Sequence, residues 1–300
     1  MSDKVKRILN YYESENPGVK ANLARILVHG KLGGSGKLVV LPVDQGFEHG
    51  PIKSFEVNPD AYDPNYHFQL AVDAGVSAYA APLGMIEAGA STYAGMLPLI
   101  LKLNSSNSLH FKNLTPDQAV TASVKDALRL GCIAVGFTIY PGSAKCFDMM
   151  EEAREIIAEA KSYGLAVVLW SYPRGEGISK EGETAVDVIA YAAHIAALLG
   201  ANIIKVKFPT KHVEKEKIEA ENIASLSQRI EYVKKSCFAG KRIVVFSGGE
   251  SKLLNDIYNE AKEIKQGGGN GSIIGRNTFQ RKKEEALSML KGIMDIYNSN

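Results

Sequence analysis

The chain of 300 residues carries 35 lysine and arginine residues against 33 aspartate and glutamate residues. The formal net charge of +2 gives no electrostatic reason to expect a nucleic acid or a membrane as partner. Its three cysteines, at 132, 146 and 237, show no CxxC spacing and leave an odd one over, which is typical of the reducing cytoplasm. The first residues show no secretory signal, and the longest apolar tract, 188–204, is too short and interrupted to span a bilayer comfortably.

The first 36 residues precede the first strong strand pattern. Residues 5–12 and 21–32 have helical patterns, and Pro17 and the glycine-rich run at 33–36 are expected to interrupt them. Because this stretch is too short to hold a core of its own, we interpret 1–36 as an N-terminal helical extension of a domain spanning 37–300.

From residue 37 onward, strand and helix patterns alternate. Near-continuous apolar runs, typical of parallel strands buried on both faces, predict strands at 38–44, 76–82, 97–104, 132–140, 165–173, 202–208, 242–249 and 271–277. Helices are predicted most clearly at 116–130, 143–163, 183–199, 212–237, 251–266 and 278–297. Thr115 and Pro116 supply an N-cap and a first-turn proline for the first of these.

Eight such units in about 265 residues predict a (β/α)8 TIM barrel. A doubly wound open sheet is the alternative fold. It would not need eight evenly distributed units, and no GxGxxG motif follows the first strand.

Polar residues gather where the predicted strands end, which is where the active sites of such barrels lie. They are Asp44 with His49, Lys102 and Asn104, Thr138 and Tyr140, Trp170 with Tyr172 and Arg174, Lys205 with Lys207, Ser247 with Gly248 and Gly249, and Gly275 with Arg276. Taken singly, several have a structural explanation, since an aspartate can cap a turn and an aromatic ring can pack in a core. Chance placement would scatter them, so the clustering favours a functional site.

The sixth strand pattern carries two lysines on one face. Side chains alternate along a strand, so Ile204 shares one face with Val206, whereas Lys205 shares the other with Lys207. Repulsion between the two ammonium groups and partial burial should lower a lysine pKa and favour the neutral, nucleophilic amine that Schiff-base chemistry needs. The alternative is a strand end whose lysines extend into solvent.

The loops after strands seven and eight indicate an anion site. Ser247, Gly248, Gly249 and Gly275 allow the backbone to approach a phosphate closely, and Arg276 adds a charged fork. Ordinary βα turns are the alternative interpretation. No HxxxH, HxH or Cys/His cluster indicates a catalytic metal.

Five segments in this order and spacing are similar to the archaeal-type class I fructose-bisphosphate aldolases of the DhnA family. They are LPVDQGFEH at 41–49, WSYPRG at 170–175, GANIIK at 200–205, SGG at 247–249 and GRN at 275–277. The resemblance implies that Lys205 forms the imine, that Tyr172 is the general acid/base and that Asp44 contacts substrate hydroxyls.

The resemblance also implies how the rest of the site is divided. Residues 247–249, Gly275 and Arg276 would hold the phosphate nearest the ketone, while Arg174 and His49 would help with the far phosphate. Lys207 would be the charge neighbour of the nucleophile. Independently of the resemblance, Trp170 shares strand parity with Tyr172, which predicts that it lines the pocket, and packing is the alternative.

The implied reaction is cleavage of fructose 1,6-bisphosphate by a homo-oligomeric enzyme that uses a lysine imine and neither metal nor organic cofactor. One alternative is a related Schiff-base synthase, similar to 2-amino-3,7-dideoxy-D-threo-hept-6-ulosonate synthase. It would share Lys205 and Tyr172 and differ in the part of the reaction beyond the C3–C4 bond. Another is a non-catalytic barrel that binds a sugar phosphate and forms no adduct.

Overall fold

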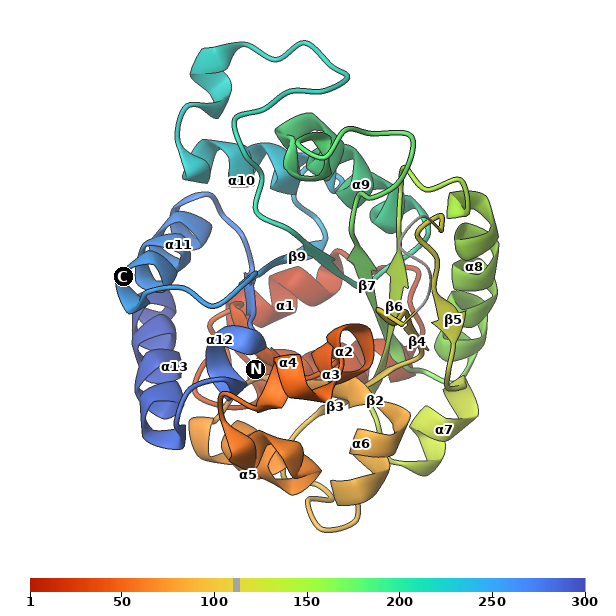
Figure 1. Ribbon diagram of the computed structural model, residues 1–300, viewed down its shortest axis with the longest axis vertical. Helices are drawn as coiled ribbons and strands as arrows, with labels where there is room; N and C mark the ends of the chain where they lie inside the picture. The colour runs from red at the N-terminus through yellow and green to blue at the C-terminus, as the bar shows by residue number, and fades with distance from the viewer. Residues whose placement is uncertain (110–113, 300) are drawn as a thin grey trace.

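A computed structural model describes residues 1–109 and 114–299. Eight parallel strands form a closed barrel in the order β1-β10-β9-β8-β7-β6-β3-β2, and helices surround it (Figure 1). The strands are β1 (Leu38–Pro42), β2 (Ala78–Pro82), β3 (Leu99–Lys102), β6 (Ala134–Ile139), β7 (Ala166–Ser171), β8 (Ile203–Val206), β9 (Ile243–Ser247) and β10 (Gly271–Ile273). Each lies within one of the eight predicted ranges, so the TIM-barrel prediction is confirmed.

The α-helices follow the strands around the barrel. They are α1 (Asp3–Asn10), α2 (Pro17–Val28), α3 (Gln45–His49), α4 (Pro51–Phe55), α5 (Pro64–Ala74), α6 (Leu83–Gly89), α7 (Val124–Arg129), α8 (Cys146–Ser162), α9 (Val186–Leu198), α10 (Leu226–Ser236), α11 (Leu254–Gln266), α12 (Arg276–Phe279) and α13 (Lys283–Asn298). Two short strands, β4 (Asn104–Ser105) and β5 (Ala119–Val120), pair in a separate antiparallel sheet, and β4 contacts β6 of the barrel through Asn104. None of the helices in the described residues has the length and apolar character needed to cross a membrane.

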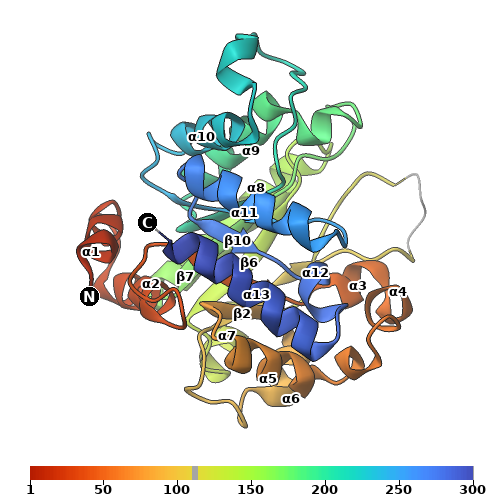
Figure 2. The same cartoon turned by 90° about the vertical axis from the view of Figure 1, so that its left-hand side faces the viewer.

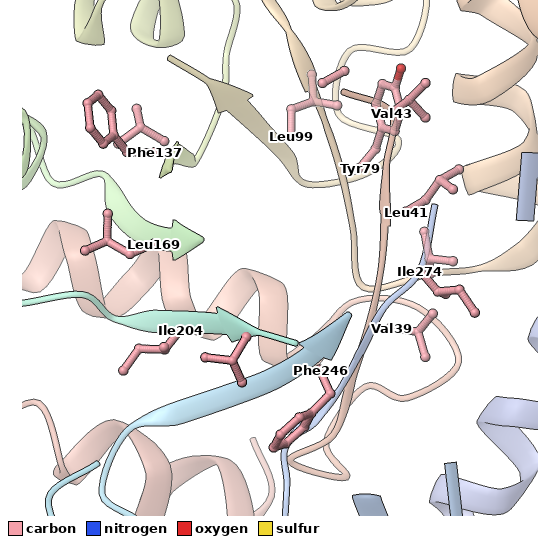
Figure 3. Close-up of a cluster of buried hydrophobic side chains, with 14 of the residues drawn as sticks. Val39, Leu41, Val43, Tyr79, Leu99, Phe137, Leu169, Ile204, Phe246 and Ile274 are labelled. Carbon is pink, nitrogen blue, oxygen red and sulfur yellow. The ribbon is translucent and has the colours of Figure 1, made fainter. Parts of the chain in front are cut away.

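Two apolar clusters hold the barrel together. The larger one lies between the strands and the surrounding helices, and Figure 3 shows Leu169, Ile204 and Phe246 among its members. The smaller one fills the barrel interior and includes Ile203 and Trp170. The alternation predicted for β8 is therefore correct, because Ile203 faces inward and Ile204 outward.

The N-terminal helices close one end of the barrel. Figure 2 shows α1 and α2 on the side of the barrel away from α3 and α4. Apolar residues of α1 and α2, such as Val5 and Leu23, belong to the interior cluster. The buried Tyr12 hydroxyl donates to the Asn202 carbonyl at 2.5 Å and accepts from the Ile243 N–H at 3.0 Å. We call this closed end the floor and the opposite end, where the strands terminate, the mouth.

Several helix predictions need correction at their starts. The helix predicted at 116–130 is only α7, because Ser123 forms a capping box with Asp126 and residues 119–120 pair with β4. The helix predicted at 212–237 is only α10, since the Asp187 carboxylate accepts the backbone N–H groups of residues 214–216 and holds them outside a helix. Residues 276–298 form two helices, and Pro17 begins α2 instead of preceding it.

Candidate active site

A cavity of about 290 Å³ opens at the mouth of the barrel. Its lining contains most of the residues that the sequence predicted for a site: Asp44, His49, Tyr172, Arg174, Lys205, Lys207, Ser247, Gly248, Gly249, Gly275 and Arg276. They come from β1, β7, β8, β9 and β10 or from the turns after these strands. Trp170 is the exception, because it lies one layer deeper and is 1% exposed.

Lys205 is a buried amine within this polar cavity. Its side chain is on β8, and the residue is 3% exposed. Its Nζ lies 5.0 Å from the centroid of the Trp170 ring and 5.5 Å from that of Tyr172. Burial lowers the pKa of Lys205 to about 8; Asp44 opposes this shift and Arg276 adds to it. A usable fraction of this amine is therefore neutral near pH 8, as a nucleophile requires.

Tyr172 lies beside this amine. Burial raises the pKa of its phenol, although a hydrogen bond with Ser247 opposes the shift. At neutral pH the phenol is therefore protonated and can act as a proton donor. Once it has lost that proton, the same raised pKa makes the phenolate a strong base.

Lys207 differs from the predicted charge neighbour of Lys205. Its Nζ forms an ion pair with Glu183 at 2.9 Å, and this carboxylate opposes the lowering of its pKa by burial. The cation that lowers the pKa of Lys205 is Arg276, and burial contributes more than any charge. Lys207 also remains close to Tyr172, with its Nζ 5.9 Å from the ring centroid.

The two glycine loops form a tight cradle next to these groups. A Cβ at Gly275 would lie 2.6 Å from the Pro42 carbonyl oxygen, so a larger residue cannot fit without a shift of the backbone. Asn277 ties the loops together, because its amide donates to the carbonyls of Gly248 and Glu250. Arg276 adds a guanidinium that is 3.7 Å from the exposed Glu250.

Glu48 lies between Arg174 and His49, the two residues predicted to help with the far phosphate. Its carboxylate is 3.8 Å from Arg174 and 3.8 Å from His49. The Arg174 guanidinium also lies over the Tyr140 ring at 4.9 Å from the centroid. Asp44 occupies the N-cap position of α3 but makes no capping hydrogen bond, so its role is not that of a turn cap.

The sequence places Lys102 at a strand end but gives it no specific role, and it assigns no role to Glu48 or Glu183. Glu48 lies within the 41–49 segment, where its position is equally consistent with a solvated turn. Lys102 ends β3 and is 3% exposed, and the strand-end pattern in the sequence includes it together with Lys205. Glu183 has no local signal, because its partner is 24 residues away. In the described part of the chain, no group of three or more His, Cys, Asp or Glu side chains is placed to hold a metal ion.

A buried, low-pKa lysine beside a tyrosine at the mouth of an eight-stranded parallel barrel defines a class of aldolases that act through a lysine imine. The model of the DeoC/LacD family of aldolases matches residues 38–281. The chain belongs to this family.

Named relatives agree with this assignment. The chain is 36% identical to the class 1 fructose-bisphosphate aldolase of Thermoproteus tenax over 262 residues, which cover 87% of this chain and 89% of that protein. It is also 36% identical to a probable class 1 fructose-bisphosphate aldolase of Chlamydia muridarum, over 98% of this chain and 88% of the relative. These relatives confirm the resemblance predicted from the five segments.

A solved structure extends the similarity to the fold. It is an archaeal fructose-1,6-bisphosphate aldolase whose catalytic lysine is covalently bound to the carbinolamine intermediate of its substrate. That structure is 35% identical in sequence, has a TM-score of 0.76 and matches 88% of this chain and 95% of its own.

Proposed function

We propose that this protein is a class I fructose-1,6-bisphosphate aldolase, a lyase that reversibly forms dihydroxyacetone phosphate and glyceraldehyde 3-phosphate in glycolysis and gluconeogenesis. The observation that carries the proposal is the pairing of Lys205 with Tyr172 inside one cavity that also contains the glycine cradle. The family assignment and the relatives support the same substrate.

The first half of the reaction forms the imine. Neutral Lys205 attacks the C2 ketone of the open-chain sugar and gives a carbinolamine. Tyr172 donates its proton to the departing hydroxyl, and water leaves. The protonated imine then withdraws electrons from the C3–C4 bond, so one difficult step becomes several easier ones.

The second half breaks the carbon–carbon bond. The Tyr172 phenolate takes the proton of the C4 hydroxyl, while Asp44 orients that hydroxyl. The C4 carbonyl of glyceraldehyde 3-phosphate forms as the bonding pair moves to C3 and leaves an enamine on Lys205. Protonation of C3 and hydrolysis of the imine then release dihydroxyacetone phosphate and restore the amine.

Charged groups at the two ends of the cavity would anchor the two phosphates. The phosphate next to the ketone would lie against residues 247–249, Gly275 and Arg276. Their glycines let the backbone approach a phosphate closely, and Arg276 adds a guanidinium. Arg174, His49 and Lys207 line the remaining polar wall, suited to the far phosphate. Such anchoring positions the C2 carbon at the amine, an effect worth about 7 to 11 kcal/mol in well-oriented reactions.

We also infer a cytoplasmic homo-oligomer. All three cysteines are free, and two of them are buried, as suits a reducing compartment. Tyr191 and Leu198 on α9 are 66% and 64% exposed, which gives that helix an apolar outer surface suited to another subunit. Light scattering on the purified protein tests the oligomer, and a monomeric mass would contradict it.

The experiment that tests the function is a coupled cleavage assay with fructose 1,6-bisphosphate and fructose 1-phosphate, with and without EDTA. Cleavage of the bisphosphate that is unchanged by EDTA is the expected result. Activity lost on chelation would favour a metal-dependent aldolase. Amino-sugar synthase activity without bisphosphate cleavage would favour the related synthase instead, and binding of the sugar without any turnover would favour a non-catalytic barrel.

A further inference from the structure

A small recess of about 20 Å³ lies next to the main cavity and shares Asp44, Glu48 and Tyr172 with it. Lys102, Gln118 and Trp170 are among its other lining residues. A volume of this size accommodates one water-sized group, and no larger one. The recess is therefore a place for a single oxygen atom next to the cavity that Lys205 lines.

The lining of the recess includes polar atoms that lack a partner. Within residues 1–109 and 114–299, the buried Gln118 Oε1 and Trp170 Nε1 atoms form no hydrogen bond. Gln118 is 8% exposed, and its Nε2 atom is already used as a donor to the Tyr140 hydroxyl. Leaving such buried groups unpaired destabilises the fold, so their presence indicates a ligand that can both donate and accept.

Lys102 is firmly held, and although burial lowers its pKa to about 8, it is mostly protonated at neutral pH and then supplies the charge of the recess. Its ammonium donates to the carbonyl and to the Oδ1 atom of Asn104, which leaves a third N–H for a ligand. Asn104 is fixed in turn by Thr138, whose N–H donates to Oδ1 at 2.7 Å and whose carbonyl accepts from Nδ2 at 2.8 Å. This supporting layer keeps the donor in one orientation.

The Trp170 ring connects this ammonium to the nucleophile. The ring centroid is 5.6 Å from the Lys102 Nζ and 5.0 Å from the Lys205 Nζ. The indole can lie there because Gly136 of β6 has no side chain: a Cβ at that position would be 2.5 Å from the ring and 3.4 Å from the Lys102 Cδ. The ring of Trp170 therefore lies within 5.6 Å of both amines, one lining the recess and the other lining the main cavity.

Building on the proposed function, we propose that Lys102, Gln118 and Trp170 form a subsite for the C3 hydroxyl of the sugar. The proposed reaction assigns the C4 hydroxyl to Tyr172 and Asp44 but assigns no residue to the C3 hydroxyl. A hydroxyl can donate to Gln118 and accept from Lys102 and Trp170. Holding it fixes rotation about C2–C3, so that the C3–C4 bond aligns with the imine.

The test compares two ketones that differ only in this hydroxyl. Dihydroxyacetone phosphate has it, and hydroxyacetone phosphate lacks it while keeping the ketone and the phosphate. Adducts are trapped with borohydride over a range of ketone concentrations and located by mass spectrometry. The wild-type enzyme should reach half-saturation at a dihydroxyacetone phosphate concentration about tenfold or more below that of the deoxy ketone.

Substitution at the subsite should abolish this preference selectively. In Lys102→Met the preference should fall below about threefold, because binding of dihydroxyacetone phosphate weakens and binding of the deoxy ketone does not. Gln118→Leu should give an intermediate preference. The exposed Lys53, which lines the outer cavity, gives the matched control: Lys53→Met should retain the wild-type preference.

Three results would overturn the proposed subsite. They are no preference between the ketones in the wild type, an unchanged preference in Lys102→Met, or equally weakened binding of both ketones in that variant. The last result would mean a merely structural role for Lys102. If neither ketone forms an adduct with the wild-type enzyme, the proposed aldolase function itself is wrong, so the two failures can be told apart.

Discussion

The floor and the mouth of the barrel are built on the same eight strands, but they differ in whether key buried polar groups have hydrogen-bond partners. At the floor, the Tyr12 hydroxyl makes two hydrogen bonds, and the Asn202 amide bonds to Glu15 and to the Val167 N–H. At the mouth, Lys205 is buried with its pKa lowered, and the recess contains unpaired atoms. Satisfied groups stabilise the fold, whereas groups left open to a ligand cost stability and provide chemistry.

The largest effect should come from removing the amine at the mouth. Lys205→Met should lower bisphosphate cleavage by on the order of 10⁴ or more, since loss of a covalent nucleophile can cost about 10⁶. Its unfolding temperature should stay the same or rise, because a poorly solvated amine is replaced by an apolar chain.

Lys207→Met is the matched control for that variant. Its amine is paired with Glu183 and is not the nucleophile, so the adduct should still form, and the loss of a cation near the far phosphate should lower cleavage far less than Lys205→Met does. Steady-state kinetics and thermal unfolding of both variants provide the check. Comparable inactivity of the two variants would show that the nucleophile is wrongly assigned.

Tyr172→Phe should have the next largest effect. If the phenol carries the proton, turnover should fall by about 10² to 10⁴. The free energy of unfolding should change little, because the lost hydrogen bond with Ser247 lies at the partly open mouth. A turnover near that of the wild type would remove Tyr172 from the mechanism.

A substitution at the floor should have the opposite profile. Tyr12→Phe leaves the Ile243 N–H and the Asn202 carbonyl without their buried partner, which should lower the free energy of unfolding by about 1 to 3 kcal/mol. The kcat/KM should remain within about twofold of the wild-type value. Denaturant unfolding measures the first quantity, with Tyr11→Phe as a neighbouring control expected within about 0.5 kcal/mol of wild type. A loss of activity without a loss of stability would contradict the division between floor and mouth.

The smallest effect concerns pH. Because the pKa of Lys205 is lowered from 10.5 to about 8, the neutral fraction should rise about fivefold between pH 7 and 8 and approach its limit above pH 9. The initial rate of adduct formation at limiting ketone should track that rise, over a range in which the phosphate is already a dianion. An apparent pKa near 10 would contradict the burial argument.

The same shift has a consequence for stability. The unfolded lysine binds its proton more tightly than the folded one, so stability should increase as pH rises from about 8 to 10.5. Below pH 8 the cost is constant, because both states are protonated. Comparing Lys205→Met with the wild type across this range isolates the contribution of this lysine.

The strands could be predicted because their burial on both faces leaves a direct signal in the sequence. Every barrel strand coincides with an apolar run. The helices that were predicted too long fail because of tertiary contacts. Residues 214–216 give their N–H groups to Asp187, and residues 119–120 pair with β4, neither of which is visible in local periodicity.

The site could be predicted to a similar degree and for a similar reason. Strand ends of a barrel converge, so Asp44, Tyr172 and Lys205 could be brought together from sequence positions alone. The pairing of Lys207 with Glu183 could not, because it depends on how the segment after β7 folds over the mouth. The recess around Lys102 depends on the missing side chain of Gly136, which has meaning only once Trp170 is placed.

The most direct test of the central claim is to treat the protein with dihydroxyacetone phosphate and borohydride and to map the reduced adduct by peptide mass spectrometry. The expected result is one adduct, on Lys205. An adduct on Lys102 or Lys207, or none at any lysine, would contradict the assignment of the buried β8 amine as the imine-forming group.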